Sequence, residues 1–150
     1  MRKAVRAIII KDNKLLVMHR NKFGNEYDTL PGGNIEIGET SEEALIRELH
    51  DETQFSISNL RLVFIEHCEH PYGEQLIYLA DTNGSEPKIL PGSEEDLINK
   101  LGMNLYKPIW LPLHDLKRLP FVTSDLKQHI LTALAEGWPE TPKEFNSKRA

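Results

Sequence analysis

The sequence has a single cysteine, no long apolar run and no excess of positive charge. Because Cys68 stands alone among 150 residues, no disulfide can form within the chain, and a reducing compartment is favoured. No stretch approaches the roughly 20 apolar residues that a membrane-spanning helix needs. The brief apolar run near the N-terminus is too short for a secretory signal peptide. These absences predict a cytoplasmic protein without a membrane partner.

The charge balance also narrows the class of partner. The chain carries 18 basic and 23 acidic side chains, a formal net charge of −5. General binding to nucleic-acid backbone needs clustered lysine and arginine, so this class of function is excluded as a main role. A phosphorylated small molecule stays compatible with the charge, because a bound divalent cation can invert the local electrostatics.

The chain is expected to form one domain over residues 1–138, followed by a loose polar tail over residues 139–150. Residues 2–11 and 14–20 are rich in β-forming residues and are separated by Asp12-Asn13, which predicts a hairpin. Strands interspersed with helices predict an α/β fold with a mixed β-sheet. Further strands are expected over Leu60–His67, Gln75–Ala80 and Tyr106–Leu111, the last an edge strand because of Pro108. Further helices are expected over Ser93–Leu101 and over Ser124–Glu136, the second capped by Ser124.

An acidic helix face is the most informative feature. Thr40 and Glu43 form a capping-box pattern that predicts a helix start. In that helix Glu48, Asp51 and Glu52 fall within about 100° of arc, while Arg47 is expected to point away from them. Three such carboxylates are either a solvated surface or a site for a hard divalent cation. Spacing alone favours the solvated surface.

The longer segment Gly33–Phe55, GNIEIGETSEEALIRELHDETQF, resembles the Nudix signature G-x5-E-x7-R-E-U-x-E-E-x-G-U, where U is a bulky aliphatic residue. Asp51 stands where the family usually has glutamate. Gln54 replaces a glycine that turns the chain after the helix, and a left-handed backbone at a non-glycine residue costs about 1–2 kcal/mol. Phe55 is aromatic instead of aliphatic. The matching residues are Gly33, Glu39, Arg47, Glu48, Leu49 and Glu52.

The resemblance implies a Nudix-type α/β/α sandwich and a Mg²⁺-dependent pyrophosphohydrolase. Such an enzyme cleaves a diphosphate linkage in a nucleoside diphosphate derivative or a nucleoside triphosphate, and Mn²⁺ suits the same oxygen ligands. Glu48 and Glu52 are implied as catalytic residues and principal metal ligands. Asp51 and a backbone carbonyl of Gly32 or Gly33 are implied as supporting ligands.

The resemblance also implies an ion pair between Glu39 and Arg47 that fixes the loop against the helix. The departures at Asp51 and Gln54 leave a second hypothesis open, a catalytically weak Nudix-fold module that binds nucleotides or has a regulatory role. The substrate, the number of metal ions and the general base stay undetermined, and a homodimer is an open alternative.

Several residues outside the signature are weaker candidates. Glu94 and Glu95 either reach the site as an outside base or simply favour the first turn of a helix, and the second interpretation is preferred. Arg20, Tyr27 and Tyr72 are weak candidates for contact with a phosphate or a base, since exposed residues at strand ends are common. The run His67–His70 contains metal-ligand residue types, but strand alternation would divide them between two faces, which argues against a zinc site.

Overall fold

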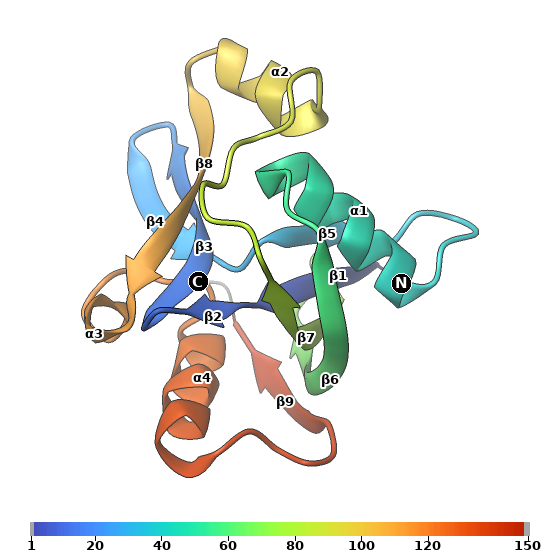
Figure 1. Cartoon of the computed structure of the whole chain (residues 1–150), viewed down its shortest axis with the longest axis vertical. Coiled ribbons are helices and arrows are strands. Elements are labelled where there is room, and N and C mark those ends of the chain that lie inside the picture. Colours follow the sequence, from blue (N-terminus) through green and yellow to red (C-terminus); the bar gives the residue numbers. More distant parts are fainter. Residues whose placement is uncertain (1, 149–150) are drawn as a thin grey trace.

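Two β-sheets organise the chain in the computed structural model, which describes residues 2–148 (Figure 1). The helices are α1 (Ser41–Thr53), α2 (Glu94–Lys100), α3 (Leu113–Leu116) and α4 (Ser124–Glu136). The strands are β1 (Lys3–Ile8), β2 (Ile10–Lys11), β3 (Lys14–Lys22), β4 (Asn25–Thr29), β5 (Gly32–Asn34), β6 (Ile57–Cys68), β7 (Glu74–Thr82), β8 (Asn104–Pro112) and β9 (Lys143–Ser147). None of the helices within the described residues has the length and apolar composition that a membrane crossing requires.

The first sheet has the strand order β5-β1-β7-β6-β9. It is mixed, as expected, because β1 and β7 are parallel, β6 and β9 are parallel, and the other neighbours are antiparallel. In the second sheet β3 pairs antiparallel with β8 along one edge and with β2 and β4 along the other. Pro108 lies in the edge strand β8, where a missing backbone donor is tolerated.

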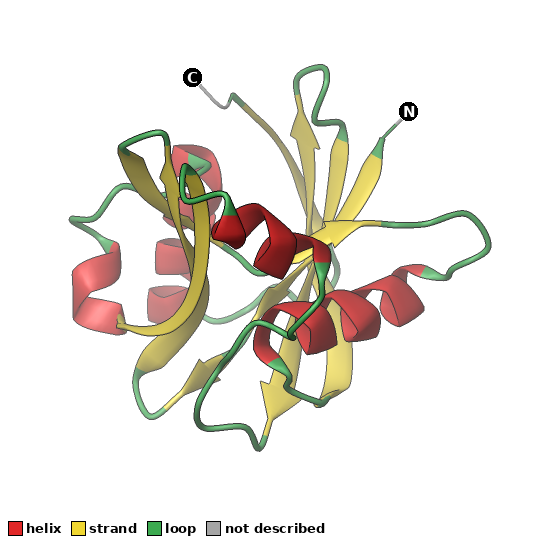
Figure 2. Cartoon of the chain, turned by 90° about the horizontal axis from the view of Figure 1, so that it is seen from above, coloured by secondary structure: helices red, strands yellow, loops and turns green. Residues whose placement is uncertain are grey.

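Helix α1 covers one face of the first sheet, as Figure 2 shows from above. Its fully buried Leu45 and Leu49 pack with Val5 and Ala7 of β1, and burial of each leucine contributes about 2 kcal/mol. The Thr40 side chain accepts from the backbone N–H of Glu43, and the N–H of Thr40 donates to the Glu43 side chain, which completes the predicted capping box. These contacts fix the helix that carries the acidic face.

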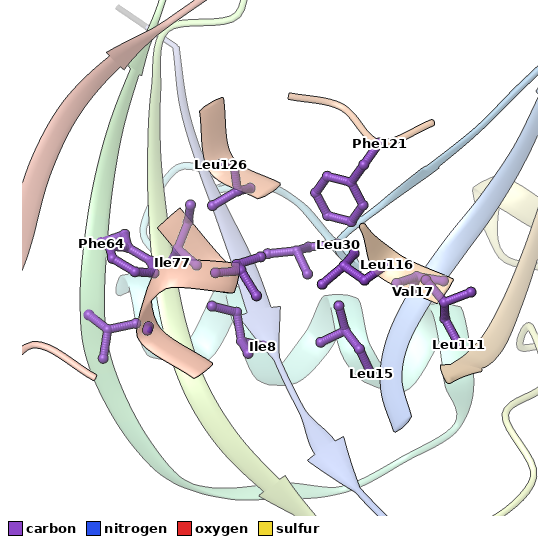
Figure 3. Packing of buried hydrophobic residues seen from close by; sticks show 13 residues of the cluster. Ile8, Leu15, Val17, Leu30, Phe64, Ile77, Leu111, Leu116, Phe121 and Leu126 are labelled. Carbon is purple, nitrogen blue, oxygen red and sulfur yellow. The ribbon is translucent and has the colours of Figure 1, made fainter. Parts of the chain in front are cut away.

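A larger core lies on the other side of the first sheet (Figure 3). Ile8 and Ile77 of the first sheet meet Leu15 and Val17 of the second, and Ile130 of α4 covers them. Because strand alternation sends neighbouring residues of β1 to opposite faces, one short strand supplies both cores. Helices on both sides of a mixed sheet agree with the predicted α/β/α layers.

The predicted hairpin is correct only at its tip. Asp12 and Asn13 form the turn with φ of 52° and 60°, the left-handed values that a type I′ turn needs. Only β2 then pairs with β3, because the chain leaves the second sheet at Ile9. The side chain of Ile9 is buried in the core beneath α1, and β1 instead pairs with β5 and β7.

The expectation of a loose tail is wrong, because β9 adds to the edge of the first sheet beside β6. The ring of Phe145 packs against Phe64, with 5.9 Å between centroids, and stacks on His129 at 3.8 Å. The polar composition hid this strand, since only Phe145 and Ser147 turn inward. The division at residue 138 stays a prediction. A smaller correction concerns α4, whose N-cap is Thr123 and not Ser124.

A buried carboxylate on β4 is hydrogen-bonded to a histidine on β3. Asp28 is 4% exposed, and its Oδ1 lies 2.7 Å from Nδ1 of His19, while Nε2 of the same ring lies 3.1 Å from Glu26. Burial by itself lowers the pKa of His19, but the hydrogen bonds and charges of the two carboxylates outweigh burial and raise this pKa above 6.5. The protonated ring therefore stabilises the folded pair of strands.

Candidate functional site

Three carboxylates from two helices meet at one point. Glu48 and Glu52 lie one turn apart on α1, and Glu95 comes from the first turn of α2. One side-chain oxygen from each of the three lies within 4.8 Å of the others. Glu52 is only 4% exposed. The acidic face of α1 is therefore largely covered, and it receives its third carboxylate from a distant segment.

Two glycines allow the backbone of β5 to approach these carboxylates. The backbone N–H of Gly32 donates to Oε1 of Glu52 at 2.6 Å. A Cβ at Gly32 would lie 1.9 Å from the carbonyl oxygen of Val5, and Gly32 has a φ of 147°. A Cβ at Gly33 would lie 2.5 Å from the carboxyl carbon of Glu48. Side chains at these two positions would therefore push β5 away from β1 and α1.

The ion pair expected between Glu39 and Arg47 is present and bidentate. Nε and Nη2 of Arg47 donate to the two carboxylate oxygens of Glu39 at 2.7 and 2.9 Å. These bonds hold the pKa of Glu39 down to about 2. The expectation that Arg47 points away from the acidic face is wrong, because Nη1 donates to Oε1 of Glu48 at 2.9 Å. The long arginine side chain reaches back along its helix and orients Glu48.

Burial disfavours the ionised form of the carboxylates in the cluster. Burial, followed by the charge of Glu48, raises the pKa of Glu52 well above its ordinary value. Burial also raises the pKa of Glu48. Burial and the neighbouring carboxylates raise the pKa of Glu95 to about 7. The guanidinium of Arg6 on β1 acts in the opposite direction on Glu48 and Glu52. The three carboxylates therefore favour either shared protons or a cation between them.

The cluster lies in a cavity of 540 Å³ that the second sheet also lines. Arg20 of β3 lies over the ring of Tyr106 at 3.6 Å from the centroid and over Tyr27 at 5.9 Å. Its guanidinium also contacts the Asn104 side chain and donates to the backbone oxygen of Leu105. The cavity therefore combines a carboxylate cluster with a cation that is already stacked on aromatic rings.

A sequence profile of the NUDIX domain matches residues 1–131. The chain belongs to the Nudix family. Curated relatives include an NAD-capped RNA hydrolase, NudC, of Photorhabdus laumondii, which is 37% identical over 75 residues, or 50% of this chain and 29% of that protein. An ADP-ribose pyrophosphatase of Methanocaldococcus jannaschii is 38% identical over 91 residues, or 57% of this chain and 53% of that protein. The matches thus span less than a third of the first relative and about half of the second.

Solved structures support the same Nudix fold. An ADP-ribose pyrophosphatase from Streptococcus suis superposes with a TM-score of 0.65 at 14% identity, covering 96% of this chain and 98% of that one. A MutT NUDIX hydrolase from Burkholderia pseudomallei has a TM-score of 0.65 at 22% identity, covering 84% and 94%. At these identities the likeness establishes the fold alone.

Two residues that depart from the Nudix signature, Gln54 and Asp51, lie at the end of α1 and in the cavity, respectively. Gln54 takes the left-handed conformation that glycine would adopt, with φ of 61° and ψ of 19°, and caps the end of α1. The turn is therefore kept at the cost of backbone strain. Asp51 and Glu94 line the cavity, but neither belongs to the group of three converging carboxylates. A direct ligand role for Asp51 stays a prediction.

The zinc alternative finds no support among residues 2–148. Nε2 of His67 lies 2.8 Å from Glu144, and Cys68 contacts the hydroxyl of Ser147, so strand pairing explains these side chains. The only group of three convergent metal-ligand residues in this part of the chain is the glutamate cluster.

The cavity residues that the sequence analysis did not single out include Arg2, Arg6 and Tyr106. Arg6 donates through Nε to Oε1 of Gln75 at 3.1 Å and through Nη1 to the backbone oxygen of Leu30 at 3.3 Å. A usable signal was present, because alternation places Arg2, just before β1, and Arg6 on one face of a strand that is otherwise mostly apolar. Two cations on that face indicate a polar cavity instead of a core.

Proposed function

We propose that this Nudix protein is a divalent-metal-dependent hydrolase that cleaves the diphosphate linkage of a nucleoside diphosphate derivative. The observation that carries the proposal is the convergence of Glu48, Glu52 and Glu95 within 4.8 Å in a cavity that also contains arginine and tyrosine side chains. Diphosphate cleavage needs cations around the phosphate oxygens and a fixed position for the substrate. The cavity contains groups for both.

The residues present fit a hard cation. Their donors are carboxylate oxygens, the ligands that Mg²⁺ and Mn²⁺ prefer. Burying carboxylates together without a positive partner is unfavourable by several kcal/mol per ion. Glu48, Glu52 and Glu95 would hold the ion, with Asp51 and a carbonyl of Gly32 or Gly33 in support. When bound, Mg²⁺ or Mn²⁺ would neutralise negative charge on the diphosphate.

The protein's own side chains would place the substrate. Arg6 is positioned beside Glu48 and Glu52 by its bonds to Gln75 and Leu30, so its charge favours a phosphate oxygen there. The stacked Arg20, Tyr27 and Tyr106 offer flat surfaces to a base or ribose. Arg47 would act indirectly, by orienting Glu48.

The names of the relatives and the charge of the chain support this substrate class. One relative is named for ADP-ribose and another for NAD-capped RNA, and both names describe diphosphates linked to a nucleoside. The net charge of −5 favours a small molecule over a nucleic acid. A cytoplasmic location and a homodimer stay part of this proposal, the first supported by the single free cysteine Cys68.

The test is product release from ADP-ribose, NADH, diadenosine polyphosphates and nucleoside triphosphates, each with Mg²⁺ and with EDTA. Cleavage of at least one compound with Mg²⁺ is expected, together with its loss in EDTA. Glu52→Gln should abolish this cleavage, and Glu42→Gln is its matched control, because Glu42 is exposed in the first turn of the same helix. Mg²⁺ binding to the folded protein with no cleavage of any compound would instead favour the catalytically weak binding module.

A further inference from the structure

A second cavity adjoins the carboxylate site. It has a volume of 580 Å³ and lies between β4, the β6–β7 turn and the start of α4. Lys22, Tyr27 and Tyr72 line both this cavity, here called the side groove, and the site cavity. These three residues therefore stand where the two spaces meet, and a ligand held at the carboxylates can extend past them.

Each of the two tyrosine rings at the junction has an arginine within cation–π distance. Arg20 lies 5.9 Å from the ring centroid of Tyr27, and Arg2 lies 5.9 Å from that of Tyr72. Such pairs are attractive and reduce the freedom of the rings. Tyrosine rings at a junction offer apolar faces to a ribose or base without requiring a particular hydrogen-bond pattern.

The side groove itself favours an anion. Its cations are Lys22 and Lys127, and the Nζ of Lys127 is fixed by donating to the backbone oxygens of Lys117 and Leu119 at 3.1 and 2.6 Å. Glu26 also lines the groove, but its carboxylate lies 3.1 Å from the ring of His19. The two ammonium groups therefore leave the groove with a positive balance.

We propose that the side groove receives the second arm of a two-armed diphosphate substrate, and that Lys22 and Lys127 select an arm that carries a phosphate monoester. The proposal rests on the proposed function, because the carboxylate site must hold the diphosphate. One arm then lies against Arg20 and Tyr106, and the other passes Tyr27 and Tyr72. A nucleoside triphosphate has only one nucleoside arm and leaves the groove empty.

The experiment compares the binding of AMP with that of adenosine 3′,5′-bisphosphate and adenosine 2′,5′-bisphosphate, by isothermal titration calorimetry with Mg²⁺. Neither AMP nor the bisphosphates contain a diphosphate bond, so binding is measured whether or not the protein hydrolyses anything. At least one bisphosphate should bind about tenfold more tightly than AMP, the gain expected of a charge-assisted hydrogen bond. Lys22→Met should remove most of this preference.

Lys14→Met is the matched control, because Lys14 is an exposed lysine at the other end of β3 and lines neither cavity. It should keep the full preference. Equal affinity for AMP and both bisphosphates in the wild-type protein would overturn the proposal, and so would a preference that survives Lys22→Met. Failure of the hydrolysis panel with this preference intact would overturn the proposed function alone.

Discussion

Helix α2 brings Glu95 to the site, yet none of its residues is buried. Its main attachment to the second sheet is the side-chain amide of Asn99. Nδ2 of Asn99 donates to the backbone oxygen of Tyr106 at 2.9 Å, and the N–H of Tyr106 donates back to Oδ1 at 2.7 Å. Asn99 lies one helical turn after Glu95, so this amide pair positions the carboxylate. We therefore predict that Asn99→Ala weakens Mg²⁺ binding, although Asn99 is not one of the proposed ligands.

The magnitude follows from the two bonds. Each contributes about 1 kcal/mol net, so their loss lowers the free energy that docks α2 by about 2 kcal/mol. A change of that size alters the docked-to-undocked ratio by up to about 30-fold. Because apparent affinity scales with the fraction of competent protein, Mg²⁺ affinity should fall by at most that factor. It cannot fall further than in Glu95→Gln, which removes the charge outright.

The assay is calorimetric Mg²⁺ titration of the wild type, Asn99→Ala, Glu95→Gln and the double variant. In the Glu95→Gln background the Asn99 substitution should have little further effect, since the group it positions is gone. Melting temperatures should change little, because α2 adds no residue to either core. Lys100→Ala is the control on the same helix, as its ion pair with Asp96 is exposed. Unchanged affinity in Asn99→Ala, or equal losses in both backgrounds, would refute the reasoning.

Four further predictions test other parts of the structure. Glu52→Gln should abolish most turnover in the product-release assay while circular dichroism shows a folded protein, and a near-normal rate would exclude Glu52 as a principal ligand. Asp51→Glu should keep or raise turnover, whereas complete loss would show a different metal geometry. Gln54→Gly should raise the free energy of unfolding in urea by about 1 kcal/mol by relieving the left-handed backbone, and a loss of stability would contradict this. The pKa of His19 is raised from 6.5, so the stability from its proton is complete below that pH and is lost as pH rises through the folded value. The difference in melting temperature between wild type and His19→Gln should therefore shrink from pH 6 to pH 9, and a constant difference would exclude this coupling.

Sequence reasoning succeeded where the information is local. The capping box at Thr40, the spacing of Glu48 and Glu52, and the pair of Glu39 and Arg47 all lie within one short segment. The capping box and the carboxylate spacing follow from helix geometry, whereas the ion pair was implied by the resemblance to the Nudix signature. The segment therefore predicted the helix, the ion pair and two of the three converging carboxylates.

Sequence reasoning was weaker where tertiary contacts determine the position of a residue. An acidic first turn is favourable in any helix, so the sequence could not show that Glu95 faces Glu48 and Glu52. The strand β9 was missed because its pairing partner, β6, lies far away in the chain and its composition is polar. The alternation that puts Arg2 and Arg6 on one strand face indicates a polar cavity, but only the pairing of β1 with β5 places Arg6 opposite Gly32, beside the carboxylates.

The proposed role of the site also offers a reason why the fold contains buried carboxylates that cost stability. Burial of Glu52 and the approach of Glu48 and Glu95 raise the energy of the charged cluster, while Arg6 and Arg47 offset only part of that cost. A fold selected for stability alone would separate these carboxylates or expose them to water. If the proposed function holds, a divalent cation would find these ligands already in place and would take over the role of the protons that the raised pKa values favour. The same arrangement would couple cation binding to the position of α2, because Glu95 comes from that helix and Asn99 bonds the helix to β8.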